Sequence, residues 1–210
     1  MPTKCCVAVI CIGEKYLKQY NELFRQSHEL YAKKCGYDFK VITEYIDENY
    51  KHADTISMQK QLICTLDWAK NYDFIICLDC DIIINHKQTP SIHNYYDLGK
   101  KIGVVNQSQP TLQARLAGQR HKGLEITAQD YYKLKSNHDI DTDHIINSGM
   151  MVCQPKIHKD FLKTVYDKYI KQQINHKNGY HYEQSVIGYE IQKNDMLNHF
   201  NKILKAKVEQ

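Results

Sequence analysis

The sequence has few residues that interrupt regular structure and no long apolar segment. Of its 210 residues only 4 are proline and 9 are glycine, which excludes collagen-like repeats and disorder rich in these two residues. No apolar run reaches the roughly 18 residues of a membrane-spanning helix, and the first residues lack the pattern of a signal peptide. We therefore expect a cytoplasmic chain without a membrane anchor, so that any membrane targeting comes from elsewhere.

Neither sign of charge dominates. The chain has 28 Lys and Arg against 24 Asp and Glu, a formal net charge of +4, and the two signs are interleaved along the sequence. This balance favours a small anionic ligand over nucleic acid as the partner. With 42% hydrophobic and 25% charged residues, the composition is that of an ordinary folded protein, and the length suits one domain.

Cysteine is well represented, with 8 residues. Most of them stand within or beside apolar runs, where a thiol usually behaves as a small buried hydrophobe in a reducing compartment. We therefore expect core thiols and no disulfide framework. The residues concerned are Cys5, Cys6, Cys11, Cys64, Cys77 and Cys153.

The apolar pattern alternates between strands and helices through the first 80 residues. Short apolar runs predict strands, and a period near 3.6 residues predicts helices. This alternation indicates parallel β-α-β units, hence an α/β fold with a mostly parallel central sheet and helices on both faces. The predicted strands are 5–12, 37–45, 74–78, 102–105 and 145–152, and the predicted helices are 14–34, 54–70, 156–173 and 183–191.

Two carboxylates follow the strand at 74–78, in the sequence Asp79-Cys80-Asp81. In extended backbone, residues two apart point to the same face, so both carboxylates would converge at the carboxyl end of a central strand, where ligands of such sheets bind. Two adjacent like charges beside a core are costly, and the usual remedies are protonation, exposure to water or a cation. A hard divalent ion that holds a diphosphate fits oxygen ligands of this kind.

The same spacing recurs among Asp139, Asp141 and Asp143, in the polar stretch SNHDIDTDH. There the carboxylates are expected to be solvated. The run also resembles the start of an EF-hand loop, but His144 replaces the required glycine and Met150 the bidentate glutamate, which argues against calcium.

Several segments together resemble the GT-A glycosyltransferases, in particular the glycogenin-like and galactosyl/xylosyltransferase families. The stretch MQKQLICTLDWAKNYDFIICLDCDIII resembles their Lys-containing helix, Trp turn, strand and DxD motif. NSGMMV at 147–152, Glu-Gln-Ser at 183–185 and His-Phe at 199–200 follow in the same order. Small members are also encoded by large DNA viruses, and the length suits one.

The resemblance implies a single catalytic domain, residues 1–210, with a nucleotide-binding half at 1–105 and an acceptor-binding half at 106–210. It implies Mn²⁺ or Mg²⁺ as cofactor, a nucleoside-diphosphate sugar, most simply a UDP-sugar, as donor, and a glycan or other hydroxyl compound as acceptor. It assigns the metal to Asp79, Asp81 and His199, and the mixed ligand set would favour Mn²⁺. The donor would contact Ile12, Gly13, Lys60, Asp79, Asn147, Ser148 and Gly149.

Glu183 and Gln184 are the residues that the resemblance places beside the reacting sugar. If configuration is retained they would stabilise its face, and if it is inverted Asp141, Asp143 or Glu183 would take the acceptor proton. The sequence departs from the family at Glu183, where an Asp is common, and after His199, where HFNKILKAK replaces the usual Gly and Lys-Pro-Trp. Either Lys202 or Lys205 would then contact the diphosphate, or His199 is not the histidine that binds the metal in the family.

The polar segment 107–143, which contains Arg115, Arg120, His121, Tyr131 and Tyr132, is the expected place for acceptor recognition. Three other functions stay open. A sugar-1-phosphate nucleotidyltransferase would need a Gly-rich loop after the first strand, and CIGEKY has one glycine. A catalytically silent nucleotide-sugar-binding module remains compatible with the sequence, and Cys77-Leu78-Asp79-Cys80 has the spacing of a thiol redox motif, although Cys77 stands in an apolar run.

Overall fold

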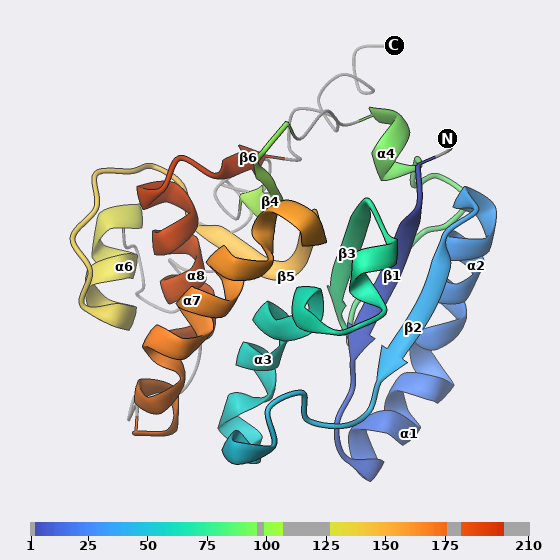
Figure 1. The fold of residues 1–210 in the computed structure, drawn as a ribbon, viewed down its shortest axis with the longest axis horizontal. Coiled ribbons are helices and arrows are strands. Elements are labelled where there is room, and N and C mark those ends of the chain that lie inside the picture. Colours follow the sequence, from blue (N-terminus) through green and yellow to red (C-terminus); the bar gives the residue numbers. More distant parts are fainter. Residues whose placement is uncertain (1–2, 96–98, 107–126, 176–181, 200–210) are drawn as a thin grey trace, which may run out of the picture.

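The computed structural model describes residues 3–95, 99–106, 127–175 and 182–199. Its centre is one sheet of six strands in the order β2-β1-β3-β5-β4-β6 (Figure 1). The strands are β1 (Cys5–Ile10), β2 (Asp38–Ile42), β3 (Phe74–Asp79), β4 (Ile102–Asn106), β5 (Ile146–Cys153) and β6 (Leu197–His199). β2, β1 and β3 run parallel to one another, β5 is antiparallel to both β3 and β4, and β6 is parallel to β4. The expected α/β fold with a mostly parallel sheet is confirmed.

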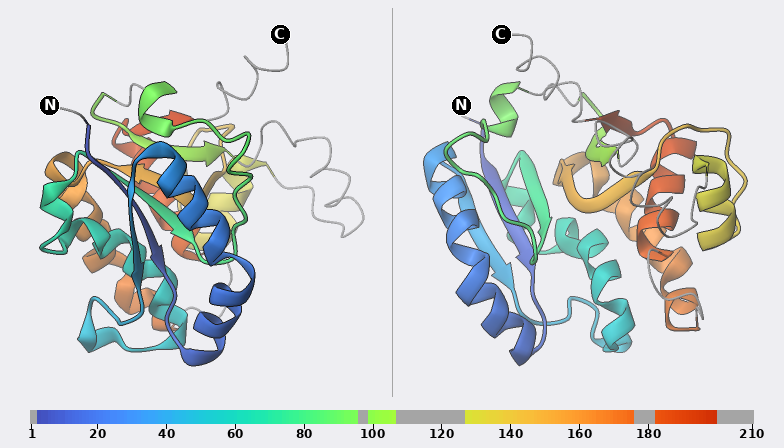
Figure 2. Two further views of the ribbon diagram at one scale, coloured as in Figure 1. Left: turned by 90° about the vertical axis from the view of Figure 1, so that its right-hand side faces the viewer. Right: turned by 180° about the vertical axis from the view of Figure 1, so that it is seen from behind.

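Helices cover both faces of this sheet, as Figure 2 shows from two further sides. On one face, α1 (Glu14–Leu23) and α2 (Arg25–Cys35) pack through Tyr20 and Tyr31 against strand residues such as Val7 and Leu78. The opposite face is covered by η3 (Lys60–Thr65), α7 (Pro155–Asn175) and α8 (Tyr182–Lys193). The central strands β1 and β3 are therefore buried on both faces, which explains why they are continuous apolar runs up to Asp79.

The remaining helical segments are short, except for one that packs against α8. α6 (Ala128–Ser136) begins at a capping box formed by Thr127 and Asp130 and buries Tyr131 and Tyr132. The short segments are η1 (Glu48–Tyr50), η2 (Ala53–Thr55), α3 (Ile56–Gln59), η4 (Ala69–Asn71) and α4 (Ile92–Tyr95). In the part of the chain that the structure describes, no helix has the length and apolar character needed to cross a bilayer.

Two helix predictions were wrong in their extent. The predicted helix 14–34 is two helices that meet at Phe24, whose carbonyl accepts hydrogen bonds from both the Ser27 amide, at 3.0 Å, and the Ser27 hydroxyl, at 2.8 Å. The predicted helix 54–70 is a series of short turns, mostly of 3₁₀ type. Lys60 to Cys64 are all buried, so this segment is enclosed between the sheet and α7 and does not present a single apolar stripe.

Candidate functional site

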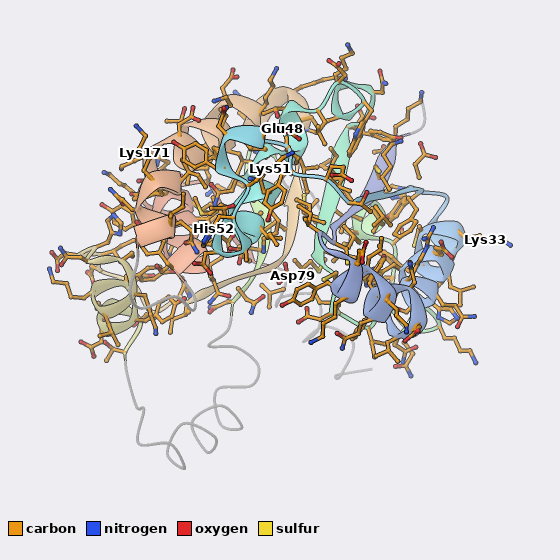
Figure 3. All side chains as sticks on the ribbon, turned by 90° about the horizontal axis from the view of Figure 1, so that it is seen from below. Lys33, Glu48, Lys51, His52, Asp79 and Lys171 are labelled. Atoms are coloured by element: carbon orange, nitrogen blue, oxygen red, sulfur yellow. The ribbon has the colours of Figure 1, made fainter. Side chains whose placement is uncertain are left out.

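Asp79 ends β3 at the edge where β1, β2 and β3 have their carboxyl ends. The strand stops there, and Cys80 and Asp81 form a turn in place of the extended backbone that we expected. The Asp79 side chain is 42% exposed, and Asp81 is exposed. Figure 3 views the molecule from this end and shows Asp79 between α1 and α2 on one side and α7 and α8 on the other. The acidic pair therefore lies where ligands of such sheets bind.

Lys60 reaches this carboxylate from the first position of η3. Its ammonium nitrogen lies 2.8 Å from Asp79 Oδ1 and 3.0 Å from the carbonyl oxygen of Ser148, and the side chain is only 6% exposed. Burial opposes the charge, but the carboxylates of Glu183 and Asp79 outweigh it and raise the pKa of Lys60 above its ordinary value. Lys60 is thus a fixed buried cation beside the acidic pair.

Glu183 stands in the first turn of α8, where the positive end of the helix dipole favours a carboxylate. Its Oε2 accepts a hydrogen bond of 2.9 Å from the Ser148 hydroxyl and lies 3.8 Å from Lys60 Nζ. Its other oxygen, Oε1, is buried and has no hydrogen-bond partner among the described residues. Burial raises the pKa of Glu183, and Lys60 opposes that rise. The result is a buried carboxyl group with one oxygen unused.

Gly149 faces Asp79 across the sheet, because Leu78 pairs with Met150 in antiparallel register. A Cβ atom on Gly149 would lie 3.0 Å from Asp79 Oδ2 and 2.9 Å from Asn147 Oδ1. The same Asn147 oxygen accepts a hydrogen bond of 2.9 Å from the Gly149 amide. Only glycine leaves both side chains in place, so the Asn-Ser-Gly sequence at 147–149 is fitted to the Asp79 carboxylate.

Gln184 is buried next to Glu183 but points to a different partner. Its Nε2 donates a hydrogen bond of 2.9 Å to the hydroxyl of Tyr131 on α6. Tyr131 and Tyr132, which we expected on the acceptor side, are both buried. Tyr132 lies against β5, since its hydroxyl accepts from the Ile146 amide at 3.2 Å. These tyrosines hold α6 against the rest of the fold, and Tyr131 connects α6 to the candidate site.

The donor set at this site suits a hard divalent cation. Asp79 and Asp81 offer carboxylate oxygens, and such an ion is commonly held by one or two carboxylates with phosphate oxygens completing its shell. Among the residues that the structure describes, no three His, Cys, Asp or Glu side chains are grouped so as to hold a metal. His199 ends β6, where its backbone pairs with Val104 of β4. Its side chain lies outside what is described, so its assignment as a metal ligand stays a prediction.

The other predicted residues lie in different places. Gly13 has a φ of 100° just before α1, a conformation that favours glycine, and it is exposed. Ile12 is buried in the core, so its side chain packs against other apolar residues. Asp143 is exposed and takes no part in the contacts of Lys60, Asp79 and Glu183. The predicted residues Arg115, Arg120, His121, Lys202 and Lys205 lie outside the described residues.

The cysteines form no disulfide, as expected, because all eight thiols are free. Cys77 and Cys80, whose spacing suggests a redox motif, belong to apolar clusters on opposite faces of the sheet. Burial also raises the pKa of Cys80 to about 12, which disfavours the thiolate that redox exchange needs. The structure therefore gives the redox hypothesis no support.

Comparison with proteins of known structure identifies the fold as that of glycosyltransferases. The chain aligns over 92% of its length with 79% of a glycosyltransferase involved in the glycosylation of the major capsid of PBCV-1, at a TM-score of 0.56 and 16% identity. It also aligns over 91% of its length with the bifunctional glycosyltransferase WbbM in its apo form, at a TM-score of 0.59 and 10% identity, and there it spans 38% of the longer chain. No protein-family model matches the sequence, and no curated protein matches it significantly.

His28, which lies near the site, was not among the residues predicted from the sequence. His28 lies under the segment that follows Asp81, with its Nε2 2.8 Å from the carbonyl oxygen of Ile82. The available signal was its position in the apolar stripe of the second helix, between Phe24 and Tyr31. A histidine at such a position needs hydrogen-bond partners, although the sequence does not say which ones.

Proposed function

We propose that the chain is a metal-dependent glycosyltransferase that moves a sugar from a nucleoside-diphosphate sugar, most simply a UDP-sugar, to a hydroxyl acceptor such as a glycan. The observation that carries the proposal is the buried contact of Lys60 with Asp79 and Glu183, at 2.8 and 3.8 Å, beside the exposed carboxylate of Asp81. This cluster lies at the carboxyl end of a central strand in a glycosyltransferase fold.

In this proposal Asp79 and Asp81 hold Mn²⁺ or Mg²⁺. When bound, the cation supplies Lewis-acid neutralisation of the charge that builds up on the departing nucleoside diphosphate. Lys60 holds the Asp79 carboxylate through its 2.8 Å contact and adds a fixed positive charge near the leaving group. Lys60 keeps this charge at neutral pH, since the carboxylates of Glu183 and Asp79 raise its pKa above the ordinary value.

Glu183 and Gln184 act on the sugar. The sugar becomes positively charged at its anomeric carbon as the bond to the diphosphate breaks, and a carboxylate on its face stabilises that charge. Glu183 Oε1 is buried and has no hydrogen-bond partner within the described part of the chain, which is costly unless a ligand group uses it. A sugar hydroxyl that donates to Oε1 would remove that cost. Asp143 remains the candidate base for an inverting reaction, from an exposed position outside the cluster.

Metal-dependent nucleotide binding tests the proposal. Calorimetry with UDP, GDP and dTDP, each with and without Mn²⁺, should show that one nucleotide binds tightly only with the metal, and that Asp81→Asn abolishes the difference. The matched control is Asp139→Asn, which removes an exposed carboxylate from another Asp-x-Asp pair, held at 2.8 Å by Lys133. If the wild type and Asp81→Asn both bind the nucleotide equally well with and without metal, Asp81 is not a metal ligand.

Product analysis separates the proposal from its alternatives. A nucleotidyltransferase would release pyrophosphate from UTP and a sugar 1-phosphate. A silent binding module would bind the nucleotide sugar without turnover. A glycosyltransferase would release UDP from a UDP-sugar and transfer the sugar to the acceptor or to water.

A further inference from the structure

Side chains of α2 hold the segment that follows Asp81, residues 82–90, against that helix. The Ser27 hydroxyl accepts a hydrogen bond of 3.2 Å from the Ile84 amide, and the Tyr31 hydroxyl donates one of 3.0 Å to the carbonyl of Pro90. Lys34 Nζ donates to three carbonyls, those of His86, Lys87 and Thr89, at 2.8, 3.2 and 3.1 Å. One helix thus fixes the course of this segment over most of its length.

His28 makes the contact that lies nearest to the acidic pair. Its side chain is fully buried, with Nε2 2.8 Å from the carbonyl oxygen of Ile82 and Nδ1 3.2 Å from the hydroxyl of Tyr20. A carbonyl oxygen only accepts, so Nε2 carries the proton and Nδ1 accepts from Tyr20. Burial lowers the pKa of His28, which keeps the ring neutral in this single tautomer.

The hydrogen bond within the turn that carries Asp81 is weak. β3 ends at Asp79, and the hydrogen bond that closes the turn, from the Ile82 amide to the Asp79 carbonyl, is long at 3.4 Å. The bond from His28 to the Ile82 carbonyl is 0.6 Å shorter, the difference between 3.4 and 2.8 Å. The position of the residue directly after Asp81 is therefore set more firmly from α2 than by the turn itself.

We propose that His28 is a positioning residue for Asp81: its Nε2–H holds the Ile82 carbonyl and thereby fixes the turn that presents the Asp81 carboxylate to the cation and diphosphate. The inference rests on the proposed function of Asp81 as a metal ligand. Residues that orient metal ligands through a hydrogen bond typically change metal affinity or activity by about 10- to 100-fold when they are replaced. His28 does this at the backbone, one residue away from the ligand.

Two substitutions of His28 separate its hydrogen bond from its bulk. In His28→Gln the side-chain amide reaches the position of Nε2 and can still donate to Ile82, whereas the shorter amide of His28→Asn reaches only the position of Nδ1. We expect His28→Asn to weaken the binding of UDP in the presence of Mn²⁺ about tenfold, and His28→Gln to restore most of the loss. Both affinities are measured by calorimetry on the full chain.

His158 supplies the matched control. It is also fully buried, burial lowers its pKa, and its Nε2 lies 3.0 Å from a carbonyl oxygen, that of Lys100. His158→Asn therefore removes the same kind of contact away from the acidic pair. We expect it to lower the free energy of unfolding about as much as His28→Asn does, while the affinity for UDP and Mn²⁺ stays within twofold of the wild type.

Backbone NMR tests the positioning role without any ligand. The amides of Cys80, Asp81 and Ile82 should show increased mobility in His28→Asn, and not in His28→Gln or His158→Asn. Unchanged mobility in His28→Asn would overturn the inference, as would wild-type affinity of that variant for UDP and Mn²⁺. If the wild type binds no nucleotide, the proposed function of the site fails, and the mobility of these amides decides the role of His28 alone.

Discussion

The ammonium group of Lys60 lies 2.8 Å from Asp79 Oδ1, and this contact joins a helical segment at 60–65 to the end of the central strand β3. The lysine is buried, whereas the carboxylate is 42% exposed. Asp79 can thus face solvent or a ligand while Lys60 holds it from behind.

Lys60→Met should destabilise the fold by about 3 kcal/mol, because it leaves the buried carboxylate of Glu183 without its cation. Urea unfolding monitored by circular dichroism measures the change. Lys163→Met is the matched control, since its ion pair with Asp167 is about half exposed and such pairs contribute less than about 1 kcal/mol. Equal losses in the two variants would contradict the structure.

Gly149→Ala should disturb Asp79 more than the fold as a whole. Its Cβ would lie 3.0 Å from Asp79 Oδ2 and 2.9 Å from Asn147 Oδ1, so one of these side chains must move. We expect metal-dependent UDP binding to weaken about tenfold, with a smaller effect on unfolding.

Gly188→Ala provides the contrast in the core. Its Cβ would meet the Tyr132 hydroxyl at 2.7 Å and Ile146 Cβ at 3.0 Å, so we expect the larger loss in unfolding free energy here. Wild-type nucleotide affinity in Gly149→Ala would show that the close approach to Asp79 is unimportant for binding.

Glu183→Gln should lower turnover of the donor about 100-fold while UDP affinity stays near that of the wild type. Its amide oxygen can still accept from Ser148, but the negative charge beside the sugar is lost. Steady-state kinetics with calorimetry separates the two effects. Glu190 lies on the same helix, and its carboxylate accepts a hydrogen bond of 2.6 Å from the Tyr169 hydroxyl. We expect Glu190→Gln to lower the free energy of unfolding without slowing turnover. Full activity of Glu183→Gln would exclude its catalytic role.

Stability should fall as the pH drops below about 6.5. Burial lowers the pKa of His28 and His158 below the ordinary value of 6.5, and no charged group contributes to either shift. Below that pH both histidines are protonated in the unfolded chain but stay neutral in the folded one. The unfolded state therefore binds more protons, and acid favours unfolding. Urea midpoints measured from about pH 7.5 to 5.5 should decrease, and less steeply in His158→Asn. A urea midpoint that rises as the pH is lowered would contradict the conclusion that both rings are buried in the neutral form.

The strands and the acidic pair could be predicted because their signals are local. Cys5–Ile10 lies within the apolar run 5–12, and Phe74–Asp79 consists of the apolar run 74–78 and Asp79 itself, the first residue of the acidic pair. The region from Asp54 to Lys70 could not be predicted in the same way. Its apolar period resembles that of a helix, but Lys60 to Cys64 are buried together between the sheet and α7, and this tertiary enclosure decides their conformation.

The partners of the site residues could not be read from the sequence either. Lys60, Ser148 and Glu183 were each candidates, yet their mutual contacts join positions that are 88 and 35 residues apart. His28 acts on Ile82, which is 54 residues away. Such pairs are determined by the sheet order and strand register together with the packing of η3, α8 and α2 on the two faces of the sheet.

The release of UDP from UDP-sugars in the presence of Mn²⁺ is the sharpest test of the proposed glycosyltransferase activity. A panel of UDP-sugars is incubated with the wild type, with Asp81→Asn and with Asp139→Asn, and UDP and the transferred or freed sugar are quantified. We expect sugar release from at least one donor, lost on chelation of the metal and in Asp81→Asn but kept in Asp139→Asn. No release from any donor, or release that survives both chelation and Asp81→Asn, would contradict the proposed activity.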